Sequence, residues 1–142
     1  MLNVLLKTTR RYSELIFESV RASQFPDLPS RQTCIYLCEF RDVDKWYSAI
    51  SPDGKAGIYE FQATGSLHKA DQRFVQDADI LPHGNFLKNA SGYWNGEQYA
   101  EDTTWEILFV GKLEVTRRFN NLEMFRDVFD NESESSGTRL SG

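Results

Sequence analysis

The stretch YWNGEQYAEDTTWEILFVGKLEVTRR, residues 93–118, decides the fold class of this chain. Residues 105–110 form a nearly unbroken apolar run rich in aromatic and β-branched side chains, which predicts a central strand covered on both faces. Gly111 interrupts this run. Residues 113–117 then alternate between apolar and polar side chains, which predicts a second strand with one solvent-exposed face. We therefore expect a strand pair in this stretch.

Glu106 is the anomaly of the apolar run. A carboxylate near the start of so apolar a strand loses hydration, and this cost persists only where a partner or a function keeps the charge in place. The candidate ion-pair partners are Arg31, Arg117 and Arg118. Glu106 is also the leading candidate for a catalytic carboxylate. Both alternatives stay open from the residues alone.

Helices and strands are expected on the N-terminal side of this stretch. Apolar residues at helical spacing predict amphipathic helices over residues 11–24 and 43–50, the second with Asp42 as its N-cap. β-branched and aromatic residues predict strands over residues 33–38 and 58–63. Together with the later strand pair, these elements predict an α+β domain with a sheet of four or more strands and flanking helices.

The remaining segments give weaker patterns. Residues 66–84 show no sustained period and predict a loop, whereas residues 86–93 and 122–129 predict short helices. Residues 131–142 lack the apolar groups that a packed segment needs and predict a mobile polar tail. We expect one domain over residues 1–130.

Composition points to a folded protein that stays in the cytoplasm. The chain has 142 residues, 40% of them apolar, which is enough for one hydrophobic core. No stretch approaches the roughly 18 apolar residues of a membrane span, so no membrane partner is expected. Cys34 and Cys38 lie about 13 Å apart if they share one strand, too far for a disulfide. We interpret both as reduced core residues.

Charge and histidine spacing make nucleic-acid binding and metal binding weak hypotheses. The net charge of −5 argues against a general nucleic-acid binder. His68 and His83 lack the spacing of a zinc motif and are expected to be surface or turn residues, so no metal site is predicted. Nucleic-acid binding therefore ranks last among the hypotheses; its candidate residues would be Lys7, Arg10, Arg11, Arg21 and Arg31.

Two blocks of sequence resemble an uncharacterised bacterial domain family. The first is IFESVR with FPDLPSR, at residues 16–21 and 25–31, and the second combines YWNG at residues 93–96 with Trp105-Glu106. We place that family within the ADP-ribosyltransferase superfamily. The order of elements is also similar to that of rifampicin-type ADP-ribosyltransferases. The resemblance covers about residues 15–118 and implies a split mixed or antiparallel sheet with flanking helices.

The resemblance implies NAD as a substrate, with ADP-ribose transferred to a protein or small-molecule acceptor. A glutamate at the start of a late strand would stabilise the positive charge that develops on the ribose, and Glu106 occupies that place. The candidate residues for binding NAD are Ser30, Arg31, Thr33, Tyr36 and Tyr93.

The N-terminal segment departs from the superfamily pattern. In that superfamily a first strand carries a His or Arg that binds NAD. Here only ten residues precede the predicted helix, and they contain no His. Arg10 and Arg11 are cations without a recognisable motif. The departure motivates a second hypothesis: a non-catalytic interaction module, such as a bacterial or phage accessory or inhibitor protein, on an altered scaffold of this kind.

Overall fold

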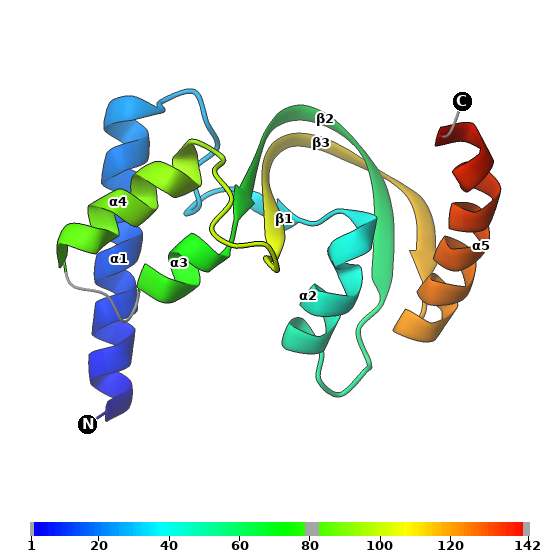
Figure 1. Ribbon diagram of the computed structural model, residues 1–142. Coiled ribbons are helices and arrows are strands. Elements are labelled where there is room, and N and C mark those ends of the chain that lie inside the picture. The colour runs from blue at the N-terminus through cyan, green and yellow to red at the C-terminus, as the bar shows by residue number, and fades with distance from the viewer. Residues whose placement is uncertain (1, 79–82, 141–142) are drawn as a thin grey trace. The chain divides into compact units, whose positions relative to one another are not determined.

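The computed structural model describes residues 2–78 and 83–140, and these residues form an α+β fold (Figure 1). The sheet order within them is β1-β3-β2. The strands are β1 (Ile35–Leu37), β2 (Ile58–Asp71) and β3 (Trp105–Phe119). β1 pairs antiparallel with β3, with Tyr36 opposite Leu108, and the arrows of β2 and β3 run in opposite directions in Figure 1.

Helices account for most of the remaining described residues. They are α1 (Leu2–Gln24), the 3-10 helix η1 (Phe40–Asp42), α2 (Val43–Ile50), α3 (Arg73–Ala78), α4 (His83–Trp94) and α5 (Leu122–Leu140). Asp42 stands at the N-cap of α2, but its side chain forms no capping hydrogen bond. Residues 131–140, expected in a polar tail, belong to α5; the mobility of that tail stays a prediction.

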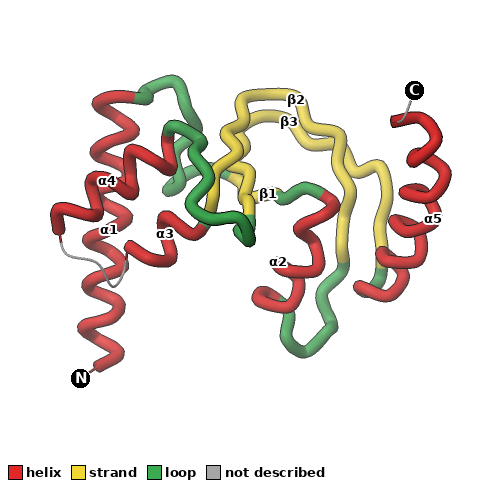
Figure 2. The backbone as a smooth tube through the Cα atoms, in the orientation of Figure 1, coloured by secondary structure: helices red, strands yellow, loops and turns green. Residues whose placement is uncertain are grey.

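The chain divides into two compact units, and the single domain over residues 1–130 stays a prediction. Unit 1 comprises Met1–Glu39 and Gly65–Gly111, and unit 2 comprises Phe40–Thr64 and Lys112–Gly142. β2 and β3 run side by side (Figure 2) and contribute residues to both units. The two units are described separately below.

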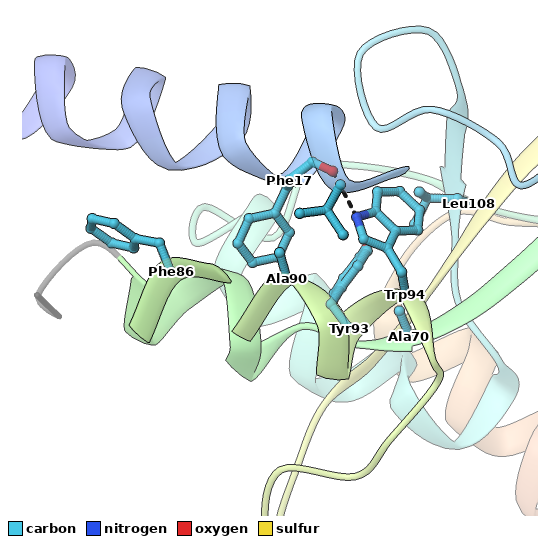
Figure 3. Close-up of a cluster of buried hydrophobic side chains, with 8 residues drawn as sticks. Phe17, Ala70, Phe86, Ala90, Tyr93, Trp94 and Leu108 are labelled. Carbon is cyan, nitrogen blue, oxygen red and sulfur yellow. Dashed lines mark hydrogen bonds between the residues drawn. The ribbon is translucent and has the colours of Figure 1, made fainter. Parts of the chain in front are cut away.

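The core of unit 1 lies between α1, α4 and the buried part of β3 (Figure 3). On α4, apolar side chains at helical spacing present one face to this core; they are Phe86, Ala90, Tyr93 and Trp94. Phe17 of α1 packs edge-on against Tyr93, with ring centroids 5.5 Å apart. Trp94 Nε1 donates a hydrogen bond to the Phe17 carbonyl at 2.8 Å, so the buried indole N–H is satisfied.

The core of unit 2 is a smaller cluster of aromatic rings. Phe125 of α5 is 5% exposed and packs edge-on against Phe119 at the end of β3, with centroids 5.3 Å apart. Phe129 stacks on Phe125 at 5.6 Å, and Phe40 meets both rings edge-on. An Arg126–Asp44 ion pair of 2.8 Å links α5 to α2.

β3 is one continuous strand of 15 residues, so the expected break at Gly111 and the count of four or more strands are both wrong for the described residues. Gly111 lies opposite Gly65 of β2, where a Cβ added to Gly65 would fall 2.8 Å from the Gly111 Cα. The glycines therefore allow two backbones to approach closely and do not end a strand. The apolar run and the alternating run differ in composition because β3 is largely buried before Val110 and largely exposed after it.

Residues 66–78 are ordered elements, which corrects the predicted loop over residues 66–84. β2 continues to Asp71, and α3 follows directly after Gln72. Asp71 is fully buried and accepts hydrogen bonds from the Arg73 and Tyr99 backbone N–H groups at 2.9 and 2.7 Å, and from the Thr103 hydroxyl. The bonds to Tyr99 and Thr103 connect segments that are distant in the sequence, so the periodicity of residues 66–84 gives no sign of them. Residues 79–82 of the predicted loop lie outside the described residues.

Replacement of Gly65 by alanine is expected to destabilise the protein by about 1–3 kcal/mol, because overpacking of a close contact costs that much. The added Cβ would lie 2.3 Å from the Val110 carbonyl oxygen. Urea unfolding measures the loss. Gly57→Ala is the matched control, since its Cβ would meet its nearest atom at 3.5 Å. Equal midpoints for the two variants would contradict the close approach.

Candidate functional site

The structure brings four of the predicted site residues together in unit 1. Glu106 is the second residue of β3, and Tyr93 lies in the last turn of α4. Arg31 lies in the turn before β1, and Tyr36 lies within β1. We call the group of Arg31, Tyr93 and Glu106, together with Glu14 of α1, the Arg31 cluster. Through Arg31 it links Glu14 and Glu106, which are 92 positions apart in the sequence.

Glu106 is buried, with 4% of the residue exposed. Its Oε1 atom accepts a hydrogen bond from Tyr93 Oη at 2.6 Å and another from Arg31 Nη1. Arg31 Nη1 also donates to Tyr93 Oη at 2.7 Å. The three groups therefore form a closed triangle around Oε1. Among the described residues, the other oxygen, Oε2, accepts no hydrogen bond.

Arg31 is the centre of the cluster. Its Nε donates to Glu14 at 3.1 Å, and its Nη2 donates to the same carboxylate at 3.2 Å. The guanidinium carbon lies 5.2 Å from the Tyr93 ring centroid and 5.4 Å from the Tyr36 ring centroid. Only 10% of the Arg31 side chain is exposed. A buried guanidinium with two carboxylates and two aromatic rings around it is a paired charge, which the interior tolerates.

Burial and charge shift the titration of this cluster. Desolvation by itself would lower the pKa of Arg31, but the negative groups around it, including Glu106 and Glu14, raise that pKa above its ordinary value. Burial raises the pKa of Tyr93, and the nearby Glu106 carboxylate adds to this effect. Burial also raises the pKa of Tyr36. Arg31 is therefore charged and both phenols are neutral throughout the physiological pH range.

Ser30 and Thr33 make their contacts elsewhere. The Ser30 hydroxyl donates to Glu18 at 2.8 Å and accepts from the Gln32 backbone N–H at 3.1 Å. Thr33 is exposed, and its backbone N–H donates to the Ser30 carbonyl at 3.2 Å. These residues shape the turn that positions Arg31. Tyr36 supports the same turn, because its hydroxyl donates to the Arg31 carbonyl at 2.6 Å.

Two residues that contact this region, Glu14 and His68, were missed from the sequence. Glu14 lies on the polar side of α1, where helical periodicity marks it only as a solvated charge. Trp105 precedes Glu106 on β3 and takes the opposite face of the strand, since neighbouring residues alternate sides; it is half-buried, with Lys69 Nζ 5.0 Å from its ring centroid. His68 was expected at the surface, but it is 9% exposed and its Nε2 lies 3.0 Å from the Tyr93 carbonyl. The side chain of His83 lies outside the described residues.

A family model described as "Protein of unknown function (DUF2441)" matches residues 1–123. The chain belongs to the DUF2441 family. The matched region contains every member of the Arg31 cluster, as well as β1, β2 and β3, and it ends within the first turn of α5. A search of the curated proteins finds no match. The DUF2441 description states no activity.

Within residues 2–78 and 83–140, no helix combines the length and apolar character that crossing a membrane needs.

Glu106→Gln is expected to lower the stability of this DUF2441 protein by about 3 kcal/mol, because breaking a buried ion pair leaves an arginine undercompensated. The value lies at the lower end of the range for such pairs, since Glu14 still binds Arg31. For a chain of this size the loss corresponds to a melting temperature lower by about 10 °C. Thermal unfolding followed by circular dichroism measures it.

Glu114→Gln is the matched control for this prediction. Glu114 lies on the same strand and pairs with Lys112 at 3.2 Å, but its side chain is 61% exposed. Its replacement is expected to leave the melting temperature almost unchanged, because exposed pairs contribute about 0–1 kcal/mol. If Glu106→Gln lowered the melting temperature no more than Glu114→Gln, the anchoring role of the Arg31 cluster would be refuted.

Proposed function

We propose that this protein is a non-catalytic, protein-binding module of the accessory or inhibitor type, on an ADP-ribosyltransferase-like scaffold. The observation that carries the proposal is an exposed aromatic stack on β2 in unit 2. Tyr59 and Phe61 are 46% and 37% exposed, and their rings stack with centroids 6.3 Å apart. Exposed aromatic side chains of this kind are typical of the anchor residues of protein interfaces.

The position of the stack supports a protein partner. β2 lies at an edge of the three-stranded sheet, beside β3. An edge strand presents backbone donors and acceptors that the strand of another protein can pair with, while alternate side chains give specificity. Tyr59 and Phe61 alternate along β2 and therefore point to the same face. Arg118 lies 5.6 Å above the Tyr59 ring and adds a cation beside the aromatic surface.

Glu106 supports a structural role over a catalytic one. A carboxylate that stabilises a developing positive charge must face the reacting atom. The Oε1 atom of Glu106 instead faces Arg31 and Tyr93, and the adjacent guanidinium already neutralises the charge. The half-buried thiols of Cys34 and Cys38 support a reducing compartment such as the cytoplasm.

A second candidate function is NAD-dependent ADP-ribosyl transfer, and one observation favours it. Among the described residues, Glu106 Oε2 accepts no hydrogen bond and remains available to a ligand. In this proposal NAD binds beside Arg31, Tyr36 and Tyr93, and Oε2 stabilises the positive charge that develops on the ribose as nicotinamide leaves. The acceptor is a protein or a small molecule.

Affinity capture from a lysate of the source organism tests the binding module. We expect a stoichiometric protein partner that is lost when Tyr59 and Phe61 are both replaced by serine. Ile50→Ser is the matched control, because Ile50 is 73% exposed in the same unit but lies on α2. A partner that the double variant retains as well as the control does would contradict the proposal.

Release of nicotinamide from labelled NAD tests the transferase. The binding module predicts no release above background by the wild-type protein and no NAD affinity in calorimetry. Nicotinamide release that Glu106→Gln abolishes, measured at a temperature where the variant is folded, would establish the second candidate function in place of the first.

A further inference from the structure

A hollow of about 560 Å³ lies in unit 1, and every residue that lines it belongs to that unit. The hollow is bordered by both sequence blocks of the family resemblance, the FPDL segment and the WNG segment. Its lining consists of Gln24, Phe25, Pro26, Asp27, Leu28, His68, Lys69, Trp94, Asn95 and Gly96. A concave surface with an apolar lining and a few polar groups is the usual form of a small-molecule site.

His68 is the polar group that distinguishes this hollow. The residue is 9% exposed, and its ring stacks on Trp94 with centroids 5.4 Å apart. Its Nε2 lies 3.0 Å from the Tyr93 carbonyl oxygen. A carbonyl oxygen only accepts hydrogen bonds, so Nε2 must carry the proton. The stack and the hydrogen bond together fix the orientation of the ring.

The second ring nitrogen of His68 is an acceptor without a protein donor. Burial lowers the pKa of His68 below its ordinary value, so the ring is neutral at pH 7 and Nδ1 holds a lone pair. Among the described residues, none donates a hydrogen bond to Nδ1. His68 lines the hollow, and its Nδ1 is not a fully buried atom. A ligand in the hollow would therefore meet a fixed acceptor.

The charged residues at the hollow do not select a charged ligand. Lys69 forms an ion pair of 2.9 Å with Glu39, and its ammonium group also lies over the ring of Trp105. Asp27 is exposed and therefore screened by solvent. The apolar side chains of the lining include Phe25 and Leu28 on the turn after α1, and Gln24 and Asn95 add polar but uncharged groups.

We propose that this hollow binds a small, flat, uncharged ligand that rests its apolar body on Phe25 and Leu28 and donates one N–H or O–H hydrogen bond to His68 Nδ1. The site does not depend on the protein-binding function, since it lies in the other unit. A ligand of the same shape without the donor would leave Nδ1 unpaired after displacing water from it. Unpaired buried acceptors are costly, and this cost supplies the selectivity.

Indole and 1-methylindole are the probes, because they share a flat apolar body and differ in one N–H donor. Titration of the wild-type protein with each probe, followed through the ¹⁵N resonances of the histidine rings, measures both affinity and place. We expect saturable binding of indole with a shift at His68 Nδ1, and at least ten-fold weaker binding of 1-methylindole. Equal affinities, no shift at His68, or no saturation by indole up to its solubility limit would overturn the proposal.

Two variants separate the hydrogen bond from the apolar contact. His68→Phe keeps a ring against Trp94 but removes the acceptor, so the difference between the probes is expected to disappear. Leu28→Ala keeps the acceptor and is expected to weaken both probes to a similar degree. A His68→Phe variant that melts normally and still prefers indole ten-fold would contradict the assignment. If that variant does not fold, the wild-type probe pair decides the question by itself.

Discussion

The buried guanidinium of Arg31 is the interaction on which unit 1 depends. Its charge needs partners in the interior: α1 supplies the carboxylate of Glu14, β3 supplies the carboxylate of Glu106, and α4 supplies the neutral hydroxyl of Tyr93 as a hydrogen-bond acceptor. Each partner comes from a different element, so a shift of any one of them would leave a buried charge uncompensated. The Arg31 cluster therefore restricts how α1, α4 and β3 pack, beyond what their apolar surfaces require.

The pairing of Arg31 with Glu106 also bears on where the protein binds its ligands. Because Arg31 already neutralises Glu106, we infer that the Arg31 cluster anchors the fold of unit 1. We place ligand binding on two other surfaces. One is the stacked pair of Tyr59 and Phe61 on the edge strand β2. The other is the hollow where His68 Nδ1 lacks a protein donor among the described residues. These surfaces belong to different units, and we propose a protein as the partner of the first and a small molecule as the ligand of the second.

Local sequence patterns predicted most helices and strands. They failed where the role of a residue depends on a contact with a residue far away in the sequence. The spacing of Phe86, Ala90 and Tyr93 indicates a helix, and Glu106 attracts attention because charge is rare in an apolar strand. The role of Gly111, by contrast, depends on Gly65 across the sheet. Arg31 was one of three candidate partners for Glu106, and sequence gives no means of choosing among them. Only the three-dimensional arrangement identifies Arg31, and it adds Glu14 as the second carboxylate.

A double-mutant cycle on Arg31 and Glu106 tests the central claim, that this pair anchors the fold of unit 1. The free energies of unfolding would be measured for Arg31→Met, Glu106→Gln and the double variant by urea denaturation. The anchoring account predicts a coupling energy of about 2–3 kcal/mol, with the double variant little less stable than either single variant. Each single substitution leaves the partner's charge buried and unpaired, and the second substitution removes that charge. Losses that add to within about 0.5 kcal/mol would show independent residues and contradict the account.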